Sequence, residues 1–116
     1  MASDPIKILI VDDDEEVLIA LERLLESEGY NTATAWSRID AIALLEKSQF
    51  DLLLVDEFLE GRDAEPLIVE LHLKQPQAFQ LLLHTGKSQK RRTTPHRVCK
   101  WEHGEMKAAI RQYLAA

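Results

Sequence analysis

The chain has 116 residues, of which 46% are hydrophobic and 29% charged, and its formal net charge at pH 7 is −6. This length fits one domain, residues 1–116, because it can bury a single hydrophobic core but not two. The single cysteine, Cys99, excludes a disulfide framework. No apolar run approaches the ~18 to 20 residues that span a bilayer, so we expect a soluble, cytoplasmic protein.

Buried strands and amphipathic helices are predicted to alternate along the chain. In order, the patterns predict a strand over Ile6–Val11, a helix over Glu15–Glu28, a strand over Asn31–Ala35, a helix from Ser37 to about Ser48, a strand over Asp51–Asp56, a helix from Pro66 to about Lys74, strands over Gln80–His84 and Arg97–Lys100, and a closing helix through Met106, Ile110 and Leu114. Gly29 fits a left-handed residue after a helix, and Ser37 with Asp40 resembles a capping box.

This alternation predicts an α/β fold with a parallel sheet covered on both sides. Because crossovers are right-handed, the simplest arrangement is a doubly wound, flavodoxin-like sheet of five strands in the order 2-1-3-4-5. Such a sheet binds its ligand outside the carboxyl ends of strands 1 and 3.

Polar side chains follow several of the predicted strands. Asp12–Asp14 follow the first strand, Asp56 ends the third, Thr85 follows the fourth and Lys100 ends the fifth. Carboxylates from two adjacent strand ends would repel one another unless a cation joined them, and Mg²⁺ suits an open site of oxygen ligands. The hydroxyl and the ammonium could then hold phosphoryl oxygens. Alternatively, the acidic triplet caps the following helix.

At this point the chain resembles the response-regulator receiver domains of two-component signalling. The resemblance covers essentially the whole chain. It rests on the strand Ile8–Asp13, on Asp56 after three apolar residues, on Leu82–Thr85, on Lys100, and on the 44-residue spacing from Asp12 to Asp56.

The resemblance implies a phosphoacceptor and a metal site. Asp56 would take a phosphoryl group from the phosphohistidine of a sensor histidine kinase or phosphotransfer protein, or from a small acyl phosphate. Asp13 and Asp56, with Asp12 through water and the backbone carbonyl of Phe58, would hold Mg²⁺.

The resemblance also implies how the other strand ends take part. Lys100 would neutralise charge on the transferred group, and the Thr85 hydroxyl would bond to it after transfer. The result would be a changed protein-interaction surface, so the chain is expected to be a signalling phosphoprotein of a phosphorelay and not a turnover enzyme. It is either a stand-alone receiver or a piece of a longer regulator.

Several positions differ from the family pattern. Only 15 positions separate Thr85 from Lys100, and residues 86–96 carry no apolar stripe, so the fourth helix is expected to be short or missing. Arg97 stands where the family has an aromatic switch residue. Trp101 replaces a proline, and because a cis bond before a non-proline residue costs about 3 to 4 kcal/mol we expect a trans bond.

The loop after Asp56 also departs from the family, because Leu59, Glu60 and Ala64 replace its commoner residues and predict a different tilt. Phe58 and Lys87 flank the expected path of hydrolytic water, and a bulky Phe58 would exclude it. Phe58 could instead simply cover apolar surface.

Two other functions fit the same fold. A pseudo-receiver would act as a phosphorylation-independent interaction module, which the short fourth helix and Arg97 favour. A metal-dependent phosphohydrolase would need a second acid two residues after the nucleophile, where Phe58 stands.

Six of the 14 basic residues lie between Gly86 and Lys100 without an acidic one, but no aromatics interleave them, so we expect a solvated loop and no direct nucleic-acid binding. The histidines share no zinc-ligand spacing.

Overall fold

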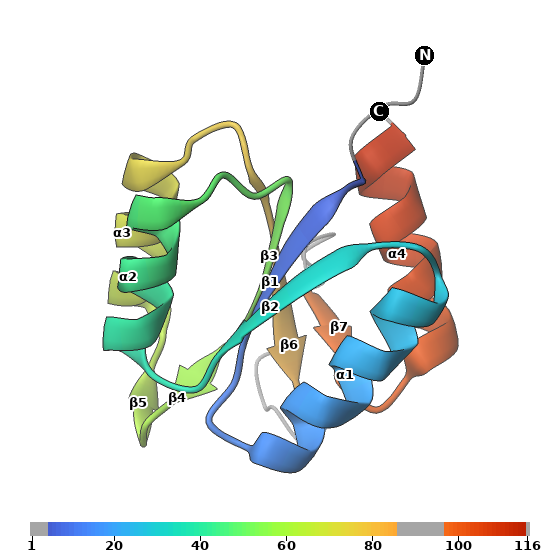
Figure 1. Ribbon diagram of the computed structural model, residues 1–116. Coiled ribbons are helices and arrows are strands. Elements are labelled where there is room, and N and C mark those ends of the chain that lie inside the picture. Colours follow the sequence, from blue (N-terminus) through green and yellow to red (C-terminus); the bar gives the residue numbers. More distant parts are fainter. Residues whose placement is uncertain (1–4, 86–96, 116) are drawn as a thin grey trace.

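The computed structural model describes residues 5–85 and 97–115, and its centre is a parallel sheet of five strands (Figure 1). The strands are β1 (Lys7–Val11), β2 (Asn31–Ala35), β3 (Leu52–Asp56), β6 (Phe79–His84) and β7 (Arg97–Cys99). Their order across the sheet is β2-β1-β3-β6-β7, and all four pairings are parallel. Since β6 and β7 are the fourth and fifth strands of this sheet, the predicted order 2-1-3-4-5 is confirmed.

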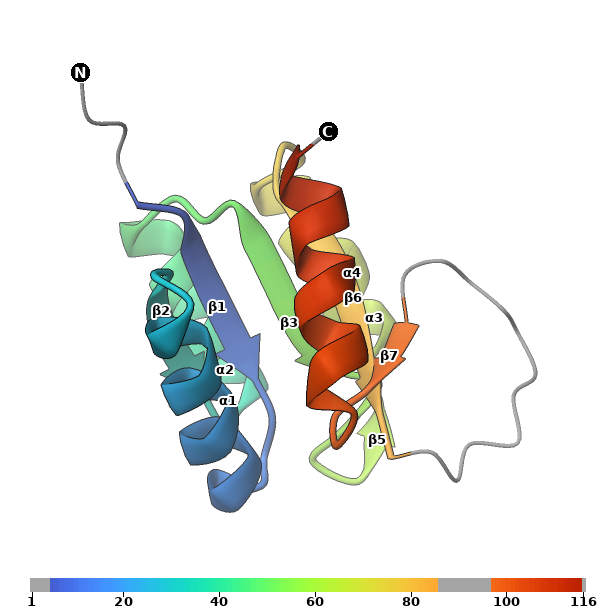
Figure 2. The ribbon, with the colours of Figure 1, turned by 90° about the vertical axis from the view of Figure 1, so that its right-hand side faces the viewer.

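Among the described residues, two helices cover each face of the sheet (Figures 1 and 2). The helices α1 (Glu15–Ser27) and α4 (His103–Ala115) pack on one face, and α2 (Arg38–Lys47) and α3 (Glu65–Lys74) pack on the other. The two hydrophobic clusters between sheet and helices make this a three-layer α/β fold.

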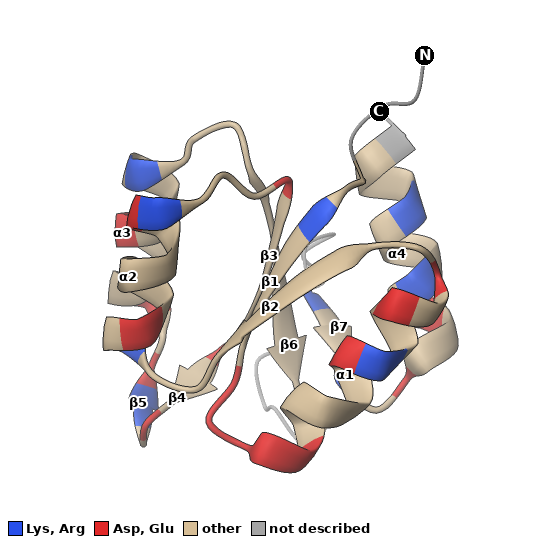
Figure 3. Cartoon of the chain, in the orientation of Figure 1, with Lys and Arg blue, Asp and Glu red and all other residues tan. Residues whose placement is uncertain are grey.

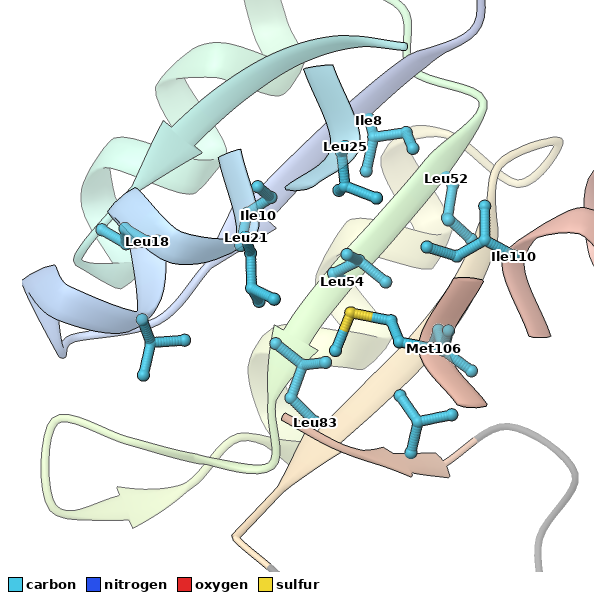
Figure 4. Close-up of a cluster of buried hydrophobic side chains, with 13 residues drawn as sticks. Ile8, Ile10, Leu18, Leu21, Leu25, Leu52, Leu54, Leu83, Met106 and Ile110 are labelled. Atoms are coloured by element: carbon cyan, nitrogen blue, oxygen red, sulfur yellow. The ribbon is translucent and has the colours of Figure 1, made fainter. Parts of the chain in front are cut away.

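The strand β3 explains why both faces must be covered. All five of its residues are buried, and successive side chains point to opposite faces. Leu52 and Leu54 therefore join the cluster under α1 and α4, which Figure 4 shows, whereas Leu53 and Val55 join the cluster under α2 and α3. A run of leucines without polar alternation is typical of such a central parallel strand.

The predicted helix signals are present at the ends of α1 and α2. Asp14 caps α1 by accepting a hydrogen bond from the Glu16 backbone N–H at 3.0 Å. Gly29, just after α1, has φ +92°, a left-handed conformation that glycine adopts without a steric penalty. The Ser37 hydroxyl accepts a hydrogen bond from the Asp40 backbone N–H at 3.1 Å and so begins α2.

One element was not predicted from the sequence. After β3, the chain forms a small antiparallel hairpin of β4 (Phe58–Leu59) and β5 (Arg62–Asp63). The two residues between these strands, Glu60 and Gly61, both have positive φ, +54° and +74°. Two-residue hairpin loops favour this geometry because it matches the twist of the strands.

The remaining expectations concern the C-terminal part of the chain. The expected shortening or loss of the fourth helix concerns residues 86–96, which lie outside the described residues. The peptide bond between Lys100 and Trp101 is trans, as predicted. Within the described part of the chain, no helix has the length and apolar character needed to cross a membrane.

Candidate functional site

Acidic residues gather where β1 and β3 end, at the edge of the sheet from which α1 begins (Figure 3). The parallel register pairs Val11 with Val55, so the next residues, Asp12 and Asp56, lie beside one another. The strand β7 ends at the same edge, since its Cys99 pairs with His84 of β6. The strand order thus brings residues that are 44 and 88 positions apart to one place.

Lys100 is the centre of this cluster. Its ammonium donates a hydrogen bond to Asp12 Oδ2 at 2.7 Å and another to Asp56 Oδ2 at 3.1 Å. All three side chains are buried, with relative exposures of 5% for Lys100, 0% for Asp12 and 8% for Asp56. A buried lysine that bonds to two carboxylates fixes the separation of those carboxylates.

Burial and charge act against each other in this cluster. Burial raises the pKa of Asp12 above its ordinary value, and the Lys100 hydrogen bond opposes this effect only in part. Burial, followed by the charge of Asp12, also raises the pKa of Asp56. Burial would lower the pKa of Lys100, but the two carboxylates outweigh it and raise this pKa overall. The carboxylates are therefore not fully compensated by one ammonium.

Asp13 adds a third carboxylate on the solvent side of the cluster. Oxygens of Asp12, Asp13 and Asp56 all lie within 4.8 Å of one another, the one such group of possible metal ligands in the described part of the chain. A hard divalent ion such as Mg²⁺ prefers oxygen ligands and keeps several waters in an open site. The donor set and its uncompensated charge fit Mg²⁺.

The acidic triplet divides between two tasks. Asp14 caps α1, which is the alternative that the sequence left open for the whole triplet. Asp12 instead bonds to Lys100, and its other oxygen accepts the Asp14 backbone N–H at 2.9 Å. The helix cap thus accounts for Asp14 alone.

The loop after Asp56 is tied to the same cluster. The Phe58 backbone N–H donates to Asp56 Oδ1 at 3.1 Å, and the Glu60 backbone N–H donates to Asp13 Oδ2 at 2.9 Å. The Glu60 side chain in turn accepts the Arg38 backbone N–H at 2.8 Å. These bonds support the left-handed conformation of Glu60, which a residue with a Cβ adopts at a cost.

Two further site residues predicted from the sequence, Thr85 and Phe58, are located by the backbone of the strands and loops around the cluster. Thr85 follows β6, in which Leu83 pairs with Asp56, so it lies at the same edge of the sheet. Phe58 is 59% exposed, and the metal-ligand role expected for its backbone carbonyl stays a prediction. Lys87 lies outside the described residues.

An ion pair beside the cluster was not predicted. Arg97 Nε donates to Glu57 Oε2 at 2.8 Å, and Arg97 Nη2 donates to Glu57 Oε1 at 2.9 Å. From the sequence alone, Arg97 stands out only as the replacement of an aromatic residue that the family resemblance implies. The adjacency of Glu57 to Asp56 was the one signal that could have suggested this partner.

A doubly wound sheet with carboxylates and a lysine at its switch point is typical of the α/β proteins whose ligand site lies outside the carboxyl ends of the strands. The family model of the response regulator receiver domain matches residues 8–97. The chain therefore belongs to the response regulator receiver domain family, as the resemblance predicted.

Curated relatives and solved structures agree with this membership. The transcriptional regulatory protein ZraR of Salmonella typhimurium (strain LT2) is 36% identical over 86 residues, which are 74% of this chain and 19% of ZraR. The chain thus spans about a fifth of the length of that relative. A CheY-like receiver domain protein from Methanospirillum hungatei JF-1 has a TM-score of 0.85 at 24% identity, with 97% of this chain and 95% of that chain covered.

The response regulator TrrA of Thermotoga maritima has the same fold. Its structure in complex with Mg(2+)-BeF has a TM-score of 0.81 at 23% identity and covers 93% of this chain and 98% of that chain. TrrA is also known in complex with the histidine kinase ThkA, where the TM-score is 0.80 at 24% identity, over 94% of this chain and 98% of that chain.

Proposed function

We propose that this chain is a phosphoacceptor signalling receiver in which Asp56 carries the phosphoryl group. The observation that carries the proposal is the position of Lys100, whose buried ammonium bonds to both Asp12 and Asp56 beside a third carboxylate. A receiver needs a carboxylate nucleophile, a cation site and a fixed positive charge within one hollow. Family membership supports the same assignment.

The transfer step requires one oxygen of Asp56 to attack phosphorus. As the new oxygen–phosphorus bond forms, the bond from phosphorus to the histidine nitrogen of the donor, or to the acyl oxygen of a small acyl phosphate, breaks. The leaving group takes the electron pair. Asp56 Oδ1 accepts the Phe58 backbone N–H and Oδ2 accepts Lys100, so the carboxylate is oriented from two sides before the reaction.

Asp12, Asp13 and Asp56 would hold Mg²⁺, with the backbone carbonyl of Phe58 as a further ligand. When bound, Mg²⁺ supplies positive charge that offsets the charge developing on the transferred group. The receiver TrrA, with its bound Mg(2+)-BeF, supports this choice of ion. In this chain, Asp13 is the exposed member of the set and the one that can be changed with least effect on the core.

Lys100 and Thr85 would act on the phosphoryl group once it is attached. Lys100 would contribute its ammonium, and the Thr85 hydroxyl would donate a hydrogen bond to a phosphoryl oxygen. An aspartyl phosphate brings close to two negative charges, so we expect the strand ends around it to rearrange. We infer that the product is a changed protein-interaction surface, and that the chain is not a turnover enzyme.

The phosphodonor would be a sensor histidine kinase, a phosphotransfer protein or a small acyl phosphate. The complex of TrrA with the histidine kinase ThkA supports a kinase partner. Signalling of this kind takes place in the cytoplasm, where we expect this chain to act.

The proposal is tested by incubating the protein with Mg²⁺ and a small acyl phosphate and measuring its intact mass. We expect a gain of one phosphoryl group, lost in Asp56→Asn and in the presence of a chelator. A folded, Mg²⁺-binding protein that gains no mass would overturn the proposal in favour of the pseudo-receiver. Continuous release of phosphate from phosphate esters would favour the phosphohydrolase instead.

A further inference from the structure

The ion pair of Arg97 and Glu57 joins two strands that are not neighbours in the sheet. Arg97 begins β7 and Glu57 follows the last residue of β3, while β6 lies between these strands. The two hydrogen bonds, at 2.8 and 2.9 Å, engage both carboxylate oxygens. The side chains are only 11% and 21% exposed, so the pair is more shielded from water than a surface ion pair.

The positions of these residues relate the ion pair to the candidate site. Glu57 is the residue after Asp56, and Arg97 is three residues before Lys100. The segments that the ion pair holds together are therefore the two segments that meet in the contact between Lys100 and Asp56. Because only a few residues of backbone separate the ion pair from the site, a change in the distance between Arg97 and Glu57 would also change the distance between Lys100 and Asp56.

The strand β7 needs such a support. It has three residues at the edge of the sheet, and its strand pairs are Arg97 with Leu82, Val98 with Leu83 and Cys99 with His84. Beyond these pairs, the Lys100 backbone N–H donates to the His84 carbonyl at 2.8 Å. A short edge strand held by few bonds moves more easily than a central strand.

The ion pair and the site lie on different faces of β7. Val98 packs into the cluster under α1 and α4, so Arg97, its neighbour in the strand, points to the opposite face. Arg97 can then fix the strand without occupying the space around the Asp56 carboxylate. Its planar guanidinium suits this task because two parallel hydrogen bonds define an orientation as well as a distance.

We infer that Arg97 is a positioning residue for phosphoryl transfer, which acts through Glu57 to hold Lys100 against Asp56. This inference rests on the proposed function, since it assigns Arg97 a part in the reaction at Asp56. At the position where the family resemblance leads us to expect an aromatic residue, this chain carries an arginine that holds β7 to the strand of the proposed phosphoacceptor.

The experiment compares four variants with the wild type: Arg97→Gln, Glu57→Gln, the exchanged pair Glu57→Arg with Arg97→Glu, and the control Arg111→Gln. The control breaks the ion pair between Arg111 and Glu28, which is also 2.8 Å long but exposed and lies between α1 and α4. All variants are measured with the same small acyl phosphate at saturating Mg²⁺.

We expect the phosphorylation rate to fall about tenfold in each single variant, because small displacements of a catalytic group cost this much or more. The exchanged pair restores the contact and recovers most of the rate, and Arg111→Gln stays within about twofold of the wild type. Unchanged rates in both single variants would overturn the inference, as would a loss that the exchanged pair does not recover. If Arg97→Gln does not fold, Arg97→Lys is used in its place. The lysine keeps the positive charge but cannot form the two parallel hydrogen bonds to Glu57, so it should still lower the phosphorylation rate.

A second readout does not depend on phosphorylation. The ammonium protons of Lys100, followed by NMR, should exchange slowly with water in the wild type and in Arg111→Gln, and faster in Arg97→Gln and Glu57→Gln. If the wild type takes no phosphoryl group but the exchange rates of the Lys100 protons differ as expected, the proposed function is wrong. The inference that Arg97 and Glu57 position Lys100 is then still supported. If the exchange rates do not differ, the inference fails whatever the phosphorylation assay shows.

Discussion

Replacing Asp56 by asparagine should stabilise the protein when no divalent ion is present. The amide keeps the shape of the carboxyl group and an oxygen that can accept from Lys100 or from the Phe58 backbone. It removes one of three carboxylates whose oxygens lie within 4.8 Å of one another. The substitution therefore exchanges a buried negative charge for a neutral group of similar size.

The distances set the size of the effect. With an effective permittivity of 20, Coulomb's law gives about 5 kcal/mol of attraction between Lys100 and Asp56 at 3.1 Å. The repulsion between Asp56 and Asp12, whose oxygens lie within 4.8 Å of one another, is at least about 3 kcal/mol. Asp13 is exposed, so its repulsion is screened to about half of that. Attraction and repulsion nearly cancel, and the cost of burying the Asp56 carboxylate decides the sign. We expect Asp56→Asn to raise the free energy of unfolding by about 1 to 2 kcal/mol.

The assay is urea unfolding at pH 7, in a chelator and in Mg²⁺, followed by tryptophan fluorescence. Mg²⁺ at ten times its dissociation constant should stabilise the wild type by about 1.4 kcal/mol and the variant by much less. The control Asp51→Asn makes the same charge change at the exposed position just before β3, where the amide oxygen can still accept the Lys7 backbone N–H, and should shift stability by less than about 0.5 kcal/mol. A lower stability of Asp56→Asn than of the wild type in chelator, or equal stabilisation of both proteins by Mg²⁺, would refute this prediction.

Three further outcomes are expected. Because the pKa of Asp56 is raised in the folded protein, its carboxylate destabilises the fold fully above that pKa, and this destabilisation disappears as the pH falls toward 3.8. In chelator, the stability advantage of Asp56→Asn over the wild type should therefore shrink as the pH falls. An advantage that grows on acidification would contradict the raised pKa. Phe58→Asn should speed loss of the phosphoryl group about tenfold, measured as decay of the phosphorylated mass, because a smaller polar side chain admits water; an unchanged decay rate would show that Phe58 only covers apolar surface. Gly29→Ala should lower the free energy of unfolding by about 1 kcal/mol in urea titrations, because residue 29 has a positive φ. The control Gly104→Ala lies in α4 with open space around it and should not lower the free energy of unfolding. Equal effects of the two substitutions would show that the positive φ of residue 29 is not the cause.

The parts of the fold that the sequence predicted are those with a strong local pattern. The apolar runs of β1 and β3 are hydrophobic on both faces, and α1 has a clear apolar stripe with acids in its first turn, so their bounds came within one residue of the structure. The hairpin of β4 and β5 was missed because strands of two residues contain no measurable alternation. Its loop also begins with Glu60, and a glutamate does not signal a positive φ.

The candidate site was predictable to the extent that it follows from strand order. Once the order 2-1-3-4-5 is set, Asp12 and Asp56 must lie side by side, and Lys100 must lie at the same end of the sheet, two strands from Asp56. The contact itself depends on the long Lys100 side chain, which reaches across β6. The pairing of Arg97 with Glu57 was not predictable, because it depends on two side chains that reach across β6. The strand register determines which strand ends are adjacent. It does not determine which side chains form a contact across an intervening strand.

We propose above all that the strand ends assemble a site that transfers a phosphoryl group to Asp56. The most direct measurement is to treat the protein with a small acyl phosphate and Mg²⁺, reduce it with borohydride, and map the product by peptide mass spectrometry. Borohydride converts an aspartyl phosphate to homoserine, so we expect this conversion at residue 56, only with Mg²⁺ and greatly reduced in Lys100→Ala. Conversion at another acidic residue, or equal conversion in a chelator, would contradict the proposal.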